Sequence, residues 1–111
     1  MAKNDYHVIM YRILAYIYAC LREGVRFNPE VVSYETLDVP ESYWTTIVKM
    51  LIEKDYIRGA FVVSILGEVE KIKWVRNVEI TPEGIEFFEE NSRMGKAKSF
   101  LRTLKDTIPG L

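Results

Sequence analysis

The chain has 111 residues, a length that suits one domain, residues 1–111, built on one hydrophobic core. Its 49% apolar content argues against disorder, and 15 basic against 16 acidic residues leave no excess charge to draw the molecule to nucleic acid or a membrane. The single cysteine, Cys20, excludes an intrachain disulfide and fits a cytoplasmic protein, and the apolar run 8–21 is too short to cross a bilayer.

The first predicted helix covers residues 4–23, with Asn4 or Asp5 as its cap and Gly24 as its end. Apolar side chains surround nearly its whole circumference, and a helix of this kind is buried on more than one side. We therefore expect it to pack against the core and against either another helix of the chain or a second subunit. Its main apolar stripe consists of Tyr6, Ile9, Met10, Ile13, Ile17, Cys20 and Leu21.

A short strand is predicted at residues 25–27, and three Pro-Glu pairs then mark helix starts. Proline fits the first helical position, where its missing N–H has no partner to lose, and the following carboxylate favours the positive end of the helix. Asn28 and Thr81 are suitable caps for two of these helices, and Asp38 replaces Val39 as the cap of the other. The predicted helices cover residues 29–36, 40–54 and 82–90.

The helix predicted at residues 40–54 is strongly amphipathic. At 100° per residue its apolar residues cover about half of the circumference, and we expect that half to face the core. The apolar half contains Tyr43, Trp44, Ile47, Val48, Leu51 and Ile52, and the polar arc contains Ser42, Thr45, Thr46, Lys49 and Glu53.

Two strands are predicted at residues 57–66 and 71–80, joined by a hairpin loop over residues 66–70. Alternation predicts that Ile57, Gly59, Phe61, Val63 and Ile65 share one face, as do Ile72, Trp74, Val78 and Ile80. Gly84 would weaken a free helix, so we expect a close backbone contact there.

A last helix is predicted from Ser92 to about Thr107, and it is basic. Its apolar positions repeat at spacings of three and four, which is typical of a packing seam: Met94, Ala97, Leu101, Leu104 and Ile108. The seam is expected to dock on the first helix or on a second copy of the chain, and the alternative role of this basic helix is phosphate contact.

The order of elements resembles the winged-helix fold: helix, short strand, two helices and a hairpin wing, here followed by two C-terminal helices in an α+β chain. Residues 51–57 and 80–84 are similar to the turns that flank the wing in bacterial winged-helix proteins. Residues 80–92 and 96–110 are similar to the YjcQ-like family. This resemblance implies a winged-helix fold and a phage or prophage setting, and it implies no activity.

The sequence offers no arrangement for catalysis. His7 and Cys20 are too far apart along one helix to form a nucleophile–base pair, and no cluster of metal ligands or glycine-rich phosphate loop occurs. We expect a non-enzymatic protein with no catalytic residue, metal, cofactor or small-molecule substrate.

Two functions remain open. In the first, a small regulator places its polar arc in the major groove of double-stranded DNA while the wing touches the phosphate backbone. Glu41, Glu53, Glu68 and Glu70 oppose this reading. In the second, the domain binds protein without binding DNA, as a homodimer or as a phage accessory factor that engages a host protein. The candidate DNA contacts are Ser42, Thr45, Thr46, Lys49, Arg58, Lys71 and Lys73.

Overall fold

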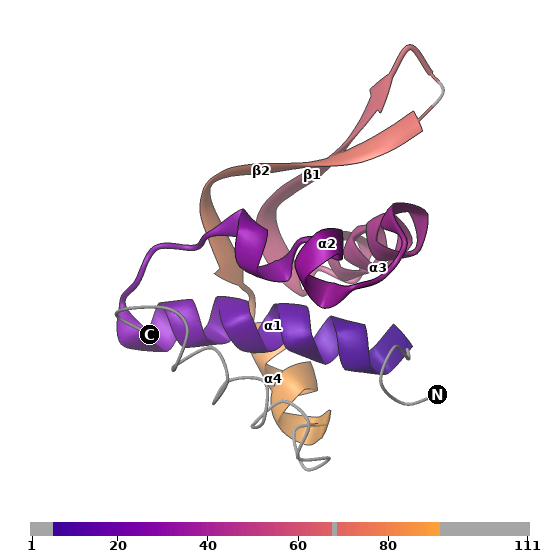
Figure 1. Cartoon of the computed structure of the whole chain (residues 1–111). Coiled ribbons are helices and arrows are strands. Elements are labelled where there is room, and N and C mark those ends of the chain that lie inside the picture. Colours follow the sequence, from indigo (N-terminus) through magenta and orange to yellow (C-terminus); the bar gives the residue numbers. More distant parts are fainter. Residues whose placement is uncertain (1–5, 68, 92–111) are drawn as a thin grey trace.

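The computed structural model describes residues 6–67 and 69–91, which form a mixed α+β structure. The proposed caps Asn4 and Asp5, Glu68, and the predicted last helix with its seam lie outside the described residues. Figure 1 shows α1 running between α4 on one side and α2 and α3 on the other, with the hairpin extending away from the helices. The elements are α1 (Tyr6–Glu23), the 3-10 helix η2 (Pro29–Val32), α2 (Tyr34–Leu37), α3 (Glu41–Glu53), β1 (Ile57–Ile65), β2 (Val69–Ile80) and α4 (Pro82–Asn91).

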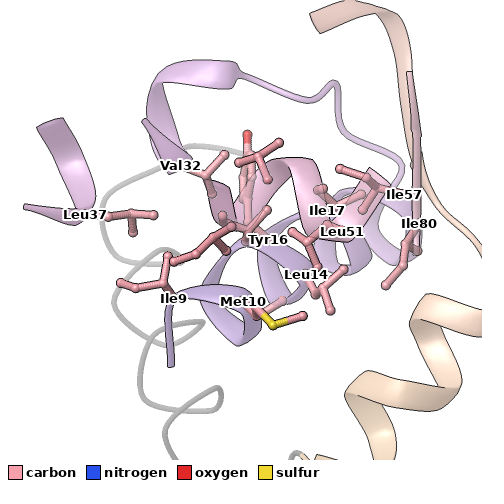
Figure 2. Packing of buried hydrophobic residues seen from close by; sticks show 14 of the residues in the cluster. Ile9, Met10, Leu14, Tyr16, Ile17, Val32, Leu37, Leu51, Ile57 and Ile80 are labelled. Carbon is pink, nitrogen blue, oxygen red and sulfur yellow. The ribbon is translucent and has the colours of Figure 1, made fainter. Parts of the chain in front are cut away.

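The helix α1 is the centre of the core, as its apolar circumference predicts. It contacts η2, α3, β2 and α4, and its middle is almost fully buried. Figure 2 shows side chains from α1 meeting Val32, Leu51 and Ile80 from three other elements. Gly24 ends the helix with a φ of 69°, as expected. Leu21 was wrongly assigned to the buried stripe: it is exposed, because it lines an open groove at the C-terminal end of α1.

The strand predicted at residues 25–27 is absent. Two hydrogen bonds tie its ends to α1: the N–H of Val25 donates to the carbonyl of Cys20 at 3.0 Å, and the N–H of Asn28, the next residue after the segment, donates to Tyr16 Oη at 2.9 Å. The segment is therefore an irregular connection held against α1 by two hydrogen bonds.

The helix predicted over residues 29–36 is divided into η2 and α2 by Ser33. Asn28 caps η2 as predicted, because its Oδ1 accepts from the N–H of Glu30 at 3.1 Å. Ser33 then caps α2 by accepting from the N–H of Thr36 at 3.1 Å, so a second start occurs where the sequence suggested continuity.

The start of α3 also differs from the prediction. Asp38 does not cap α3; it ends α2 in the left-handed region, with a φ of 59°. Pro40 occupies the cap position of α3 without a side-chain hydrogen bond, and the helix begins at Glu41. A left-handed residue suits aspartate better than most non-glycine residues, which explains its use at the end of α2.

The apolar half of α3 lies in the core, as predicted. Trp44, Ile47, Val48 and Leu51 are buried. The indole Nε1 of Trp44 donates to the buried carbonyl of Val32 at 2.7 Å, which fixes α3 to η2. A buried carbonyl without a partner costs stability, so this bond makes the placement of α3 specific.

β1 and β2 form a two-stranded antiparallel sheet with a register shift near its base. Ile57 pairs with Ile80, and Arg58 pairs with Glu79. The next pair is Ala60 with Trp74, so the single residue Gly59 on β1 faces the four residues 75–78 on β2. Gly59 has a φ of 88°, and a side chain there would collide with the backbone of Asn77. Only glycine fits this position without strain.

The register shift overturns the predicted face of β1. Ile57 and Ala60 are buried, so the inward side chains change from odd to even positions across Gly59, and Phe61 is 54% exposed. One residue of β1 faces four of β2 at the shift, and an odd offset of this kind sends every following side chain to the opposite face of a strand. The β2 prediction is confirmed, since Ile80 is buried and Ile72, Trp74 and Val78 pack against the core.

The turn into α4 is built on Thr81. Its Oγ1 accepts from the N–H of Gly84 at 2.9 Å, which confirms the predicted cap, and the same hydroxyl donates to the carbonyl of Asp55 at 2.5 Å. The N–H of Thr81 donates to the carbonyl of Tyr56 at 3.0 Å. A side chain at Gly84 would collide with that same carbonyl, which confirms the expected close contact.

Candidate interaction surface on α3 and the hairpin

A groove of about 560 Å³ separates the N-terminal half of α3 from the distal part of the hairpin. It brings together the three predicted hydroxyl residues of α3, while Arg58 and Lys73 lie on the hairpin outside its lining. Two carboxylates also face the groove. Its lining consists of Glu41, Ser42, Thr45, Thr46, Ser64, Gly67, Val69 and Glu70.

The hydroxyl residues of α3 do not form one uniform polar face. Ser42 and Thr46 are exposed, and Thr46 Oγ1 donates back to the carbonyl of Ser42 at 3.0 Å. Thr45 is only 8% exposed, so little of its side chain is available to a partner. It directly follows the buried Trp44, at the border of the two halves of the helix, and it lines the groove.

The two groove-side lysines are already paired with carboxylates. Lys49 Nζ lies 3.1 Å from Glu70 Oε2, and Lys71 Nζ lies 2.8 Å from Glu41 Oε2. The hydrogen bond and charge of Glu41 raise the pKa of Lys71. Both ion pairs join α3 to β2. Each of the two lysines predicted to contact phosphate here is therefore neutralised by a carboxylate. Exposed pairs of this kind contribute little to folding stability.

The remaining predicted cations are exposed on the hairpin. Arg58 lies opposite Glu79 in the ladder, and Lys73 lies opposite Phe61. An opposite charge across a strand pair reduces the local positive potential. Lys71 also has an apolar cross-strand neighbour, Val63, but it is paired with Glu41, whereas the residue opposite Lys73 in the ladder carries no charge.

Sequence reasoning missed the apolar surface of the distal hairpin. Leu66 at the turn is 91% exposed, and Phe61 and Val69 are each more than half exposed. The signal was present in the sequence, because residues 59–67 contain no charged side chain. Alternation predicted that Phe61 shares a face with Ile57, but after the register shift Ile57 is buried and Phe61 is exposed.

The described residues give no sign of a metal centre or a catalytic pair. In the parts of the chain that the structure describes, no group of three or more histidine, cysteine, aspartate or glutamate side chains is placed to hold a metal ion. His7 is exposed beside the rings of Tyr6 and Tyr11. Within residues 6–67 and 69–91, no helix has the length and apolar character needed to span a membrane.

Cys20 is buried, and burial raises the pKa of its thiol. We expect Ellman's reagent, at mildly alkaline pH, to label Cys20 only as fast as the chain unfolds, because the thiolate is the reactive form. The control is the same reaction in denaturant, which should finish at once. Rapid labelling of the folded chain would contradict the buried placement.

These features define a mixed α+β domain with a helical core and a projecting hairpin that borders a polar groove. The sequence model of the YjcQ protein family matches residues 11–107, and the chain therefore belongs to that family. No curated protein and no solved structure matches the chain.

Proposed function

We propose that the chain is a non-enzymatic winged-helix protein whose hairpin and α3 bind another protein. The order of helices and hairpin supports the winged-helix assignment, with α3 in the position of the recognition helix and the hairpin in the position of the wing. The observation that carries the protein-binding role is the exposed apolar surface of the hairpin, centred on Leu66. Exposed apolar side chains that gather on one element are typical of interaction sites.

The electrostatics of the same face support this choice over DNA. Binding to DNA draws most of its affinity from cations that neutralise phosphates. Lys49 and Lys71 are instead paired with Glu70 and Glu41, so the groove presents balanced charges. A protein partner needs no such excess of positive charge.

Site-specific photo-cross-linking in cells tests the protein-binding role. A photoreactive amino acid at position 66 should form adducts with protein, because Leu66 is at the centre of the proposed surface. The matched control places the same amino acid at the exposed Glu86 of α4. Adducts at position 66 that do not exceed those at position 86 would contradict the proposal.

A second candidate function is DNA binding by a small regulator, and the exposure of Ser42, Thr46, Arg58 and Lys73 favours it. It predicts an affinity for duplex DNA that falls steeply between about 50 and 200 mM salt as counterions are released. Fluorescence anisotropy with labelled duplexes measures this dependence. Absent binding at low salt would exclude this candidate and leave the protein-binding role standing.

Neutralising the two paired carboxylates should raise any affinity for DNA. In the double variant Glu41→Gln and Glu70→Gln, Lys49 and Lys71 lose their partners and become available to phosphates. We expect this double variant to bind DNA more tightly than the unmodified chain. Its affinity should also depend more steeply on salt, because binding would release about two more counterions. The control Glu83→Gln with Glu86→Gln makes the same charge change on α4, away from the groove. Equal effects of the two double variants would show that only net charge matters.

A further inference from the structure

The outer edge of β1 is an unprotected strand edge. β1 has one neighbour in the two-stranded sheet, so its other edge is open in the described structure. Residues 60–65 of β1 contain neither charge nor proline, whereas the facing stretch of β2 contains Glu70, Lys71 and Lys73. Proteins usually protect edge strands with charges, prolines or bulges. The register shift at Gly59 lies nearer the base, so the distal ladder is regular from Ala60 to the turn.

α3 contacts both strands of the hairpin, but the ion pairs that join them do not involve the backbone edge of β1. Both ion pairs between α3 and the hairpin end on β2, at Glu70 and Lys71. Figure 1 shows the distal strands of the hairpin projecting away from α1 and α4. Among the described residues, the backbone hydrogen bonds of residues 60–65 are those of the ladder with β2, and none reaches another element.

We propose that this edge pairs with the β1 edge of a second copy, antiparallel about a twofold axis near Val63, to make a four-stranded sheet. The inference rests on the proposed role of the hairpin in binding protein and names the partner. A twofold interface must be complementary to itself. Around Val63, β1 meets this requirement because the facing residues of both copies are uncharged.

The edge of β2 is charged, so pairing through β2 would depend on register. An antiparallel pair of β2 strands centred on Ile72 would set Lys71 of each copy opposite Lys73 of the other, and like charges directly opposite each other are unfavourable. In the proposed pair of β1 strands, Phe61 and Val63 of both copies lie on the same face of the joined sheet. The two apolar surfaces therefore form one continuous surface. A two-stranded ribbon is only marginally stable alone, and two added strands give it the neighbours that it lacks.

Sedimentation of the full chain over a range of concentrations tests the inference. The unmodified chain should approach twice its monomer mass of 13.0 kDa as concentration rises. The double variant Phe61→Lys and Val63→Lys should raise the dimer dissociation constant at least about 100-fold, because it sets like charges opposite each other across the axis. The matched control, Val69→Lys and Val75→Lys, adds the same charges to exposed positions of β2 and should leave dimerisation nearly unchanged.

Cysteine cross-linking gives a test that does not depend on the folding of the lysine variant. A residue near a twofold axis lies close to the same residue of the second copy. Val63→Cys should therefore form an intermolecular disulfide under mild oxidation, whereas Val75→Cys should not. A constant monomer mass at every concentration, or equal cross-linking at both positions, would overturn the inference. If the chain is monomeric but position 66 still forms adducts with other proteins, the second copy is excluded while the proposed function stands.

Discussion

Replacing Gly84 with alanine is expected to lower the free energy of unfolding by about 3 kcal/mol, because an added methyl group in a tightly packed site forces backbone shifts. The methyl group would collide with the carbonyl of Tyr56, which already accepts from the N–H of Thr81 at 3.0 Å. Backbone atoms cannot rotate away as a flexible side chain can. Thermal and urea unfolding followed by circular dichroism measure the loss, which corresponds to a melting temperature lower by roughly 10 °C or more.

Two further alanine variants separate the steric collision at Gly84 from the effects of helix propensity and backbone strain. Glu86→Ala changes an exposed residue of the same helix and should stay within about 0.5 kcal/mol of the parent. Gly24→Ala enters open space but has a φ of 69°, so it should cost about 1 kcal/mol from backbone strain alone. If Gly84→Ala were no worse than Gly24→Ala, the close approach of α4 to Tyr56 would be refuted.

The turn at Gly84 bears on function because it fixes the base of the hairpin. The hydroxyl of Thr81 bridges Asp55, just before β1, and Gly84, in the first turn of α4. The direction in which the hairpin leaves the core is therefore coupled to the seating of α4. Loosening this turn should weaken any contact that depends on the hairpin, even though Leu66 itself is unchanged.

The parts of the fold that the sequence predicted are those fixed by local pattern. The buried half of α3 follows from helical spacing, and the turn at Thr81 follows from the capping preference of threonine and the unusual position of Gly84. The burial of α1 follows from its apolar circumference. Each of these depends on residues within a few positions of one another, which a single sequence displays directly.

The candidate site was harder to predict because it depends on register. Lys49 and Glu70 are 21 residues apart, and they meet only because the hairpin folds back along α3. The exposure of Phe61 depends on the shift at Gly59, which spacing along β1 alone does not reveal. Residue types identified the candidate cations, but only the fold shows that carboxylates neutralise two of them.

Replacing Trp44 with alanine is expected to cost about 3–5 kcal/mol, the usual range for removing a large aromatic side chain from a core. Trp44 is buried, and it contacts the rings of Tyr34 and Trp74 as well as the carbonyl of Val32. The ring therefore connects α2, α3 and β2, and its loss should free α3 from both sides. Chemical denaturation with circular dichroism measures the change.

Trp44→Phe separates the hydrogen bond from the packing. Phenylalanine keeps an aromatic ring but cannot donate to the carbonyl of Val32, so it should cost about 1–3 kcal/mol for the buried acceptor left unpaired. Trp74→Phe, at a partly buried tryptophan, is the matched control for reduced ring size. If Trp44→Phe costs no more than Trp74→Phe, the bond to Val32 does not anchor α3. In that case packing alone would hold the groove-forming face of α3 in position beside the hairpin.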